Sequence, residues 1–366
     1  MNFADVRYPI ETPPAPGKTI EVAPGVRWLQ MPLPFSLNHI NLYLIEDGDG
    51  WAIVDTGIRD EGVQETWEEI FANEMDGKPV TKVIVTHMHP DHIGNAGWLC
   101  RRWDVELFIS RTEFYHSRGV MAEQDRGFSE VAMRFYHRSG LDQKVMDEIR
   151  DAGTGNYKRT TELLPFGYRR LLDGDTLRLG DRDWEVITGS GHSPEHVCLY
   201  ARDLDVLISG DQVLPRITSN VSVHPMEPEE NPMKFWIASH HKFKGLPSTA
   251  YVLPAHNRPF YGLHDRLDYL IHHHEDRMEA LEEACMEGQI AVDLLPVLFE
   301  RELDSFQMML AIGECYAHLH CLMDRGRMER TIGEDGRYRF RTAGAARTEP
   351  HDEAEHDRPD DAPMMV

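Results

Sequence analysis

Apolar and polar residues follow one another in patterns that predict strands and one helix in the first quarter of the chain. Two runs have the composition of strands, and the turn residues at 47–50 make the next run the return strand of a hairpin. Hydrophobic residues then recur at helical spacing, and a short apolar run before residue 86 suits a fully buried strand. The order strand, helix, strand predicts a βαβ-like unit, whose ligands bind beyond the carboxyl ends of the strands. The predicted strands cover 26–31, 40–45, 51–54 and 80–85, and the helix carries Val63, Trp67, Ile70 and Phe71.

The rest of the chain divides into segments of different character. Residues 103–170 combine aromatic residues with many charges and predict a helical insertion, and residues 265–285 predict one long amphipathic helix. Further strands are predicted at 176–179, 184–187, 197–200, 206–208 and 251–253. Two helical stretches followed by a hairpin predict a winged-helix-like module at the C-terminal side. The predicted organisation is a Pro-rich arm at 1–18, a main domain at 19–290, this module at 291–341 and an acidic, disordered tail at 342–366.

Charge and cysteine content restrict the class of protein. Lys and Arg number 38 against 62 Asp and Glu, which gives a formal net charge of −24. A negative surface repels nucleic acids and anionic membranes, so we expect neither as a general partner. The five scattered cysteines form no CxxC pair and predict reduced, buried thiols. No signal peptide and no long apolar run are visible, so we expect a cytoplasmic protein without a membrane span.

The segment Val85-Thr86-His87-Met88-His89-Pro90-Asp91-His92 places four side chains that can bind a metal within six residues, directly after a predicted buried strand. Imidazole nitrogens and a carboxylate oxygen suit a divalent ion such as zinc. Three later segments, each at the end of a predicted strand, offer further ligands. They contain His192, Asp211 and His256. The pattern therefore indicates a metal site at one edge of the sheets.

With these motifs the chain resembles the metallo-β-lactamase-fold hydrolases, and among them the glyoxalase II-type branch. The resemblance covers residues 20–290 and implies an α/β fold of the αββα sandwich type, with two mixed sheets packed face to face and helices outside. It also implies two divalent cations, by default zinc, with iron or manganese as alternatives. The first would be bound by His87, His89 and His192, the second by Asp91, His92 and His256, and Asp211 would bridge the two.

The resemblance extends to residues beside the ligands. It implies that Asp55 lies behind the ligands and orients one of them, and that His196 has a similar supporting place. Zinc β-lactamases generally lack the bridging aspartate, so the resemblance argues against β-lactam hydrolysis. The chain departs from the family pattern where Glu195, Ala255 and Asn257 occupy positions at which glycine is common.

The implied chemistry is hydrolysis, in which two cations lower the pKa of a shared water toward ~7 and the resulting hydroxide attacks the substrate. Asp91 and His256 are the expected catalytic residues. We expect a small-molecule acyl substrate, a thioester or carboxylic ester that is plausibly acyl-CoA-like. A lactonase would use the same ligands, a metal-dependent nuclease is the alternative from another substrate class, and a non-catalytic binding module is the third.

Substrate contacts are harder to derive from the sequence. Arg216, Asn220 and Arg258 follow the ligands at 211 and 256 closely and are the candidate substrate-binding residues. The aromatic residues of the insertion either form an apolar pocket over the metals or form the core of the insertion itself. Successive residues of a helix point about 100° apart, so the triplet His272-His273-His274 cannot share one ion. The C-terminal module suggests packing or a homodimer rather than binding of nucleic acid.

Overall fold

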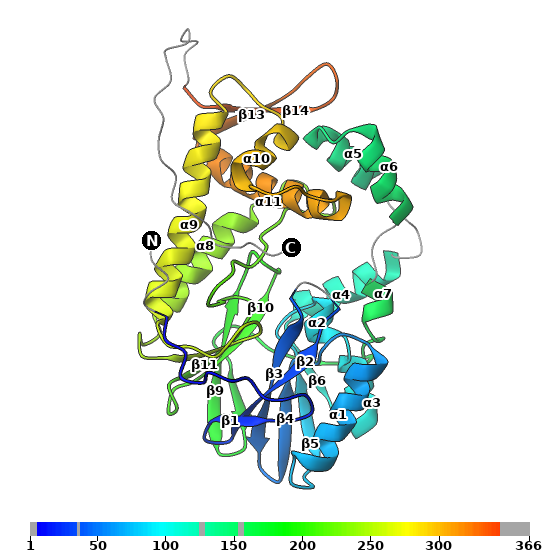
Figure 1. Cartoon of the computed structure of the whole chain (residues 1–366), viewed down its shortest axis with the longest axis vertical. Coiled ribbons are helices and arrows are strands. Elements are labelled where there is room, and N and C mark those ends of the chain that lie inside the picture. The colour runs from blue at the N-terminus through cyan, green and yellow to red at the C-terminus, as the bar shows by residue number, and fades with distance from the viewer. Residues whose placement is uncertain (1–5, 35–36, 124–128, 153–156, 345–366) are drawn as a thin grey trace. The chain divides into compact units, whose positions relative to one another are not determined.

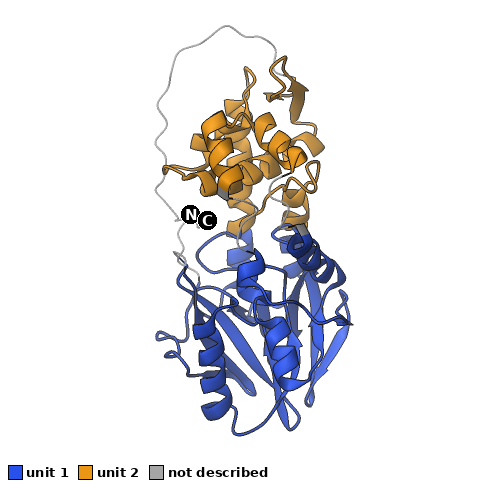
Figure 2. Cartoon of the chain, turned by 90° about the vertical axis from the view of Figure 1, so that its right-hand side faces the viewer, with its two compact units in different colours: residues 1–125, 155–219, 239–268 blue, residues 126–154, 220–238, 269–366 orange. Residues whose placement is uncertain are grey.

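A computed structural model describes residues 6–34, 37–123, 129–152 and 157–344, and the chain in it forms two compact units. Figure 1 shows the elements and Figure 2 shows the two units in different colours. Unit 1 comprises residues 1–125, 155–219 and 239–268, and unit 2 comprises residues 126–154, 220–238 and 269–366. Each unit therefore combines segments that are far apart in the sequence.

The first sheet of unit 1 has seven strands in the sequential order β1 to β7. The pairs from β1 to β4 are antiparallel, whereas β4, β5, β6 and β7 run parallel to one another. The predicted hairpin and the βαβ unit are both confirmed. The strands are β1 (Ile20–Ala23), β2 (Val26–Pro32), β3 (His39–Asp47), β4 (Gly50–Val54), β5 (Val80–Ile84), β6 (Leu107–Ile109) and β7 (Arg169–Arg170).

The second sheet has five strands in the order β12-β11-β10-β9-β8, and only β11 and β12 pair in parallel. Its apolar side chains share one buried core with those of the first sheet. Trp28 from β2 and Trp184 from β9 are both fully buried in this core. The strands are β8 (Thr176–Leu179), β9 (Arg182–Gly189), β10 (His196–Ala201), β11 (Val206–Gly210) and β12 (Tyr251–Pro254).

Helices cover the outer face of the first sheet, where they build a second core. Helix α1 (Glu61–Asn73) buries Trp67 and Ile70 against this sheet, and α3 (Ala96–Trp103) buries Leu99 there. The α1 helix begins at Asp60, whose side chain accepts a hydrogen bond from the Gly62 N–H and so satisfies one of the first helical donors. Two mixed sheets with helices outside confirm the αββα prediction.

The segment 103–170, predicted as a helical insertion, also contains two short strands. Strands β6 and β7 extend the first sheet, and they are too short to produce a recognisable pattern in the sequence. The described residues between them form the helices α4 (Arg111–Glu123), α5 (Glu130–Ser139), α6 (Gln143–Ala152) and α7 (Tyr157–Thr160).

Several aromatic residues of this segment pack in the cores of their own units, whereas Tyr115 and Phe166 are exposed. In unit 1, Phe114 and Tyr157 belong to the core under the first sheet, and Phe114 stacks on Tyr168 with a centroid distance of 4.1 Å. In unit 2, Phe135 meets the Tyr316 ring edge-on at 5.1 Å. For these residues the structure favours the core interpretation over a pocket that covers the metals.

Unit 2 contains the helices and the hairpin that follow the main domain. Helices α8 (Pro232–Phe243) and α9 (Leu263–Ala284) contribute residues to both units, and α9 confirms the predicted long helix. Besides α5 and α6, unit 2 contains the 3₁₀ helix η2 (Ala291–Leu294), α10 (Leu295–Leu298), α11 (Ser305–Asp324) and the antiparallel pair β13 (Met328–Ile332) and β14 (Tyr338–Thr342). The winged-helix detail and the domain boundaries stay predictions, and the tail from residue 345 lies outside the described residues.

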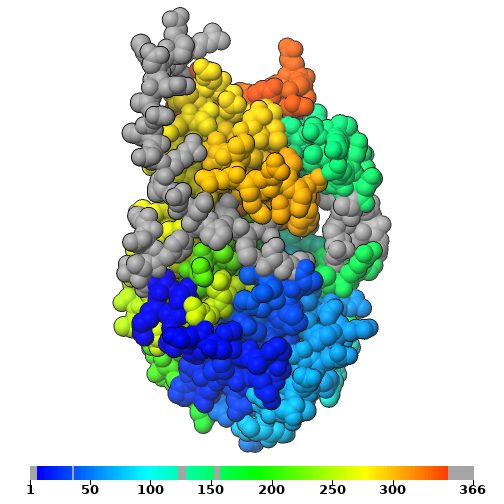
Figure 3. All heavy atoms as spheres, viewed as in Figure 1, coloured from blue at the N-terminus to red at the C-terminus, as the bar shows by residue number. Residues whose placement is uncertain are grey.

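The N-terminal arm lies on the surface of unit 1. Its dark-blue residues cover part of the face that Figure 3 turns to the viewer. Among the helices in the described part of the chain, none combines the length and apolar character needed to cross a membrane.

Candidate metal centre

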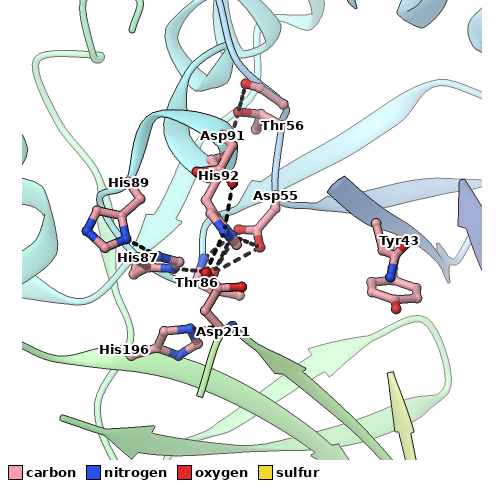
Figure 4. Close-up of polar contacts among 12 residues, drawn as sticks. Tyr43, Asp55, Thr56, Thr86, His87, His89, Asp91, His92, His196 and Asp211 are labelled. Atoms are coloured by element: carbon pink, nitrogen blue, oxygen red, sulfur yellow. Dashed lines mark hydrogen bonds and ion pairs between the residues drawn. The ribbon is translucent and has the colours of Figure 1, made fainter. Parts of the chain in front are cut away.

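The candidate ligands gather at one edge of the two sheets because the elements that carry them end there. Strand β5 ends at Ile84, and the HxHxDH motif follows it into the short helix α2 (Pro90–Ile93). His192 lies between β9 and β10, Asp211 directly follows β11, and His256 comes shortly after β12. Figure 4 shows the residues of the motif together with Asp211 and His196.

Three imidazoles and one carboxylate form the first group of candidate ligands: His87, His89, His192 and Asp211. The His89 Nδ1 atom lies 2.8 Å from His87 Nε2 and 3.0 Å from His192 Nε2. The His192 Nε2 atom lies 3.4 Å from Asp211 Oδ2. Their ligand atoms all lie within 4.8 Å of one another.

The second group consists of Asp91, His92 and His256, and Asp211 lies beside it as well. The His92 Nε2 atom is 3.6 Å from Asp91 Oδ2 and 3.5 Å from Asp211 Oδ2. The His256 Nε2 atom is 3.4 Å from Asp91 Oδ2 and 3.3 Å from Asp211 Oδ1. The Asp211 carboxylate therefore faces both groups.

The residues of both groups fit divalent cations. His89 Nδ1 faces two other ring nitrogens, although a single ring nitrogen can donate to only one of them. The His92 Nε2 and Asp211 Oδ1 atoms are buried and have no hydrogen-bond partner among the described residues. Nitrogen and oxygen ligands about 2.1 Å from one ion lie roughly 3.0–3.4 Å from one another, which is close to the spacings found here.

The charges of the site follow from burial and from the close carboxylates. Burial and the neighbouring histidines lower the pKa of His87 well below its usual value. Burial raises the pKa of Asp91, but His92 and His256 outweigh it and hold that pKa at about 2. Burial lowers the pKa of His256, but Asp211 and Asp91 raise it to about 9. The site thus keeps both carboxylates ionised at neutral pH, as cation binding requires.

Asp55, which the family resemblance places behind the ligands, contacts His92 of the motif and Thr86 directly before it. Its Oδ2 atom lies 2.8 Å from His92 Nδ1, and its Oδ1 atom accepts a hydrogen bond of 2.8 Å from the Thr86 N–H. The Thr86 hydroxyl also donates to Asp55 and lies 3.1 Å from His87 Nδ1. These contacts, drawn as dashed lines in Figure 4, leave Nε2 of His92 facing the site.

His196 supports the site through the backbone of Asp211. Its Nε2 atom accepts a hydrogen bond of 3.1 Å from the Asp211 N–H, and burial lowers its pKa to about 3, so the ring is neutral and can accept. Gly210 adopts a positive φ of 51°, and a Cβ atom there would lie 2.5 Å from the His196 ring. Only glycine therefore allows this approach.

The loop that carries His256 is held by main-chain contacts. His256 Nδ1 lies 3.1 Å from the His39 carbonyl oxygen, which turns Nε2 toward the carboxylates. Asn41 donates to the carbonyls of Pro254 and Asn257, each over 2.8 Å. Asn257 adopts a positive φ of 68°, which explains why the family commonly has glycine there and why asparagine is tolerated.

Glu113 is a supporting residue that the sequence analysis missed. This fully buried side chain, in the first turn of α4, accepts hydrogen bonds from the Met88 N–H at 2.9 Å and the Glu195 N–H at 2.8 Å. It joins the HxHxDH segment to the segment that carries His192. Glu195 in turn accepts a hydrogen bond of 2.9 Å from the Thr112 N–H, which gives a structural reason for its presence.

Replacing Glu113 by alanine is expected to lower the free energy of unfolding by about 2–4 kcal/mol, because two buried N–H groups lose their acceptor. Glu113→Gln keeps one acceptor oxygen and is expected to lose roughly half as much. Urea denaturation of the three proteins measures the difference. Equal stability of Glu113→Ala and the unchanged chain would contradict this role.

The structure separates the three predicted substrate contacts. Arg216 and Arg258 line the same cavity of unit 1. Asn220 lies in unit 2, where its amide donates to Glu314 Oε2 over 3.1 Å and its oxygen accepts from the Ser222 hydroxyl. The substrate role of Asn220 stays a prediction.

The histidine triplet on α9 lies in unit 2 and makes separate contacts. His273 Nε2 accepts a hydrogen bond of 2.9 Å from Arg277, and His274 Nδ1 lies 3.0 Å from His318 Nε2. Neither belongs to a group of candidate metal ligands in the described part of the chain.

The contact between Asn220 and Glu314 leads to a prediction about pH. Burial raises the pKa of Glu314 to about 7, against 4.5 as its ordinary value, although Arg277 opposes the shift. The folded chain thus keeps a proton that the unfolded chain loses, and stability falls as pH rises from about 4.5 to about 7. Glu314→Gln stays neutral, so we expect it to be more stable than the unchanged chain by up to about 3 kcal/mol near pH 8 and unchanged near pH 5. Denaturation at both pH values, with the exposed Glu302→Gln as control, tests this; an equal effect at both would contradict it.

The chain belongs to the metallo-β-lactamase superfamily. The family described as Metallo-beta-lactamase superfamily matches residues 36–284, and the family described as Metallo-beta-lactamase-like, C-terminal domain, matches residues 278–343. The fold and the two groups of candidate ligands agree with this assignment, and the chain is a metallo-hydrolase of this class.

Particular relatives support the same class. The crystal structure of a beta-lactamase domain protein from Burkholderia ambifaria is 43% identical, covers 93% of this chain and 99% of its own, and superposes with a TM-score of 0.86. The probable metallo-hydrolase YqjP of Bacillus subtilis is 24% identical over 80% of this chain and 91% of its own length. The human acyl-coenzyme A thioesterase MBLAC2 is 24% identical over 52% of this chain and 63% of its own length. The glyoxalase II-type branch has no specific support among these relatives.

Proposed function

We propose that the chain hydrolyses a thioester or carboxylic ester of the acyl-CoA type. Two divalent cations would take part, one in each group of candidate ligands, and the Asp211 carboxylate lies between the two groups. The observation that carries the proposal is the position of the Asp211 carboxylate. Its two oxygens lie 3.3–3.5 Å from nitrogens of both groups of candidate ligands. Similarity to a protein named as an acyl-coenzyme A thioesterase supports the thioester as substrate class.

In the proposed reaction, His87, His89 and His192 would hold one cation, and Asp91, His92 and His256 would hold the other. Zinc is the default, and a site of histidine and aspartate also accepts iron or manganese. The cations, when bound, lower the pKa of water toward ~7 and polarise the carbonyl oxygen of the substrate.

The residues of the chain supply the positioning and the proton acceptor. With a pKa of about 2, Asp91 is ionised at neutral pH, so its carboxylate can accept a hydrogen bond from the attacking water and orient it. His256 lies beside this carboxylate, with its Nε2 atom 3.4 Å from Asp91 Oδ2, a spacing that suits two ligands of one cation. A carbon–oxygen bond to the acyl carbon forms, the carbon–sulfur or carbon–oxygen ester bond breaks, and the proton from water passes to the leaving group.

Hydrolysis of a panel of thioesters tests the proposal. We expect the metal-loaded chain to release free thiol from acyl-CoA substrates between acetyl and palmitoyl. His89→Ala is expected to lose this activity, whereas His272→Ala, an exposed histidine of α9, should keep it. Silence across all chain lengths would contradict the thioester assignment. Proton release from lactones alone would assign a lactonase, and RNA cleavage lost in His87→Ala would assign a nuclease.

The proposed partner is therefore a small acyl substrate. The net charge of −24 opposes nucleic acid as a partner. A homodimer and a cytoplasmic location stay predictions from the sequence.

A further inference from the structure

Unit 1 contains a cavity of about 570 Å³ that is separate from the candidate ligands themselves. The N-terminal arm contributes Tyr8 and three prolines to its lining, and the end of β2 contributes further residues. The polar part of the lining includes Arg216 and Arg258. In Figure 3 the dark-blue arm lies beside yellow-green atoms from a much later part of the chain.

The arm is fixed against unit 1 and is not a loose extension. The Arg7 N–H donates to the Tyr261 carbonyl over 3.0 Å, and the Tyr261 N–H donates back to the Arg7 carbonyl over 2.9 Å. Arg258 donates to the Glu11 carbonyl over 3.0 Å and stacks over the Tyr8 ring. The prolines that follow restrict the backbone further. The arm therefore forms a preformed wall of the cavity.

The two arginines in this cavity have no carboxylate partner among the described residues, although the chain carries a net charge of −24. Arg216 is held in place through its neighbours in the sequence. The buried Arg266 donates to the carbonyls of Leu214 over 2.6 Å and Ile217 over 2.7 Å, so the backbone that presents Arg216 is clamped on both sides. The Arg258 guanidinium group is fixed by its contacts with the arm, and the exposed Arg216 side chain extends from the held backbone. Two guanidinium groups without a carboxylate partner at one cavity favour an anion.

The cavity adjoins the second group of candidate ligands. His39 and Asn257 both line it. The carbonyl of His39 contacts His256, and Asn257 is the next residue after His256. The Asn257 Nδ2 atom and the His39 Nε2 atom are buried and have no hydrogen-bond partner among the described residues. An occupant of this cavity would thus touch polar groups next to a candidate metal ligand.

We propose that this cavity binds the anionic part of the substrate, a carboxylate or phosphate on a partly apolar body, through Arg216 and Arg258. The inference rests on the proposed hydrolase function and names its substrate class. The prolines of the arm and Pro32 of β2 pack against the apolar part, and the guanidinium groups pair with the anion. A neutral acyl chain would displace water from the two guanidinium groups without replacing the lost hydrogen bonds, and this desolvation costs free energy.

The anion can belong to either side of the scissile bond, and matched substrates distinguish the two. The first pair is glutaryl-CoA and butyryl-CoA, which differ by a carboxylate on the acyl side. The second pair is butyryl-CoA and the butyryl thioester of N-acetylcysteamine, which lacks the phosphates of the CoA leaving group. We expect the arginines to affect the KM of the more anionic substrate in one of these two pairs.

Steady-state kinetics of Arg216→Ala and Arg258→Ala in the metal-loaded chain give the test. A lost charge-assisted contact of about 1.5–3 kcal/mol corresponds to a rise in KM of roughly tenfold to a hundredfold for the anionic member of that pair. Its neutral member and kcat should change little. Arg178→Ala, which removes an exposed ion pair between Arg178 of β8 and Asp183 of β9, is the matched control and should leave KM unchanged. Arg216 makes no hydrogen bond within the described fold, so its variant reports on the ligand even if Arg258→Ala loosens the arm.

Binding to the metal-free chain separates this inference from the proposed function. Titration calorimetry with CoA and with glutarate is expected to show binding of one of them that Arg216→Ala abolishes. That result supports the cavity even if no thioester is hydrolysed. Thioester hydrolysis with KM unchanged in both arginine variants, or no binding of either ligand, would overturn the inference and leave the hydrolase intact.

Discussion

Replacing Asp211 by alanine is expected to abolish most of the hydrolytic activity, with kcat reduced on the order of 10³-fold or more, which corresponds to about 4 kcal/mol of transition-state stabilisation. The physical reason is its place: this one carboxylate faces His192 on one side and His92 and His256 on the other. Without this carboxylate, the site lacks the negative charge between the three neighbouring imidazoles that would hold two cations close together. Metal content should fall in the same variant.

The comparison that makes this result specific is Asp203→Ala. Asp203 is exposed and pairs with Arg182 over 2.7 Å in the same unit, so its loss removes a carboxylate without touching the candidate centre. Asp211→Asn keeps the shape of the side chain and removes its charge, and should resemble alanine in metal content. Full activity in Asp211→Asn would show that the bridging charge is unnecessary.

Asp55→Asn is expected to lower the affinity for the second cation by about 10-fold to 100-fold while the fold is kept. The amide oxygen can still accept from the Thr86 N–H, but the amide nitrogen then faces His92 Nδ1 as a donor. To accept this hydrogen bond, His92 Nδ1 must be unprotonated. The proton of the neutral ring then lies on Nε2, the atom that faces Asp91 and Asp211. A protonated Nε2 cannot bind a metal.

Metal titration by calorimetry measures this loss, and ¹⁵N NMR of the histidine rings reports the change of tautomer. Asp60→Asn is the control, because asparagine caps a helix as well as aspartate does, and α1 should be unaffected. An unchanged second affinity together with an unchanged His92 tautomer would show that Asp55 does not orient this ligand.

The sequence predicts most of the fold because its strands and helices carry clear periodic patterns. The apolar run at 80–85 and the helical spacing of Trp67 and Ile70 correspond to β5 and α1. The motif after a strand and the later strand ends indicate a metal site at one edge of the sheets, and the resemblance to a known family then selects the seven candidate ligands. The structure brings all seven into two neighbouring groups.

Other features could not be derived, because they depend on contacts between distant segments. Glu113 is one acidic residue among 62, and only the fold shows that it accepts from Met88 and Glu195. The His39 carbonyl that orients His256 carries no signal in the sequence. The sequence predicts the Pro-rich arm as a separate extension. In the structure, Arg7 of the arm pairs with Tyr261, and the arm lines a cavity.

The central claim, a centre for two cations bridged by one aspartate, is tested most directly by metal analysis of the purified chain. The chain is equilibrated with zinc, iron or manganese, passed over a desalting column and measured by mass spectrometry of the elements. The structure predicts about two bound ions per chain for the unchanged sequence and clearly fewer for Asp211→Ala. A chain that retains no ion of any of the three metals, or two ions without the Asp211 carboxylate, would contradict it.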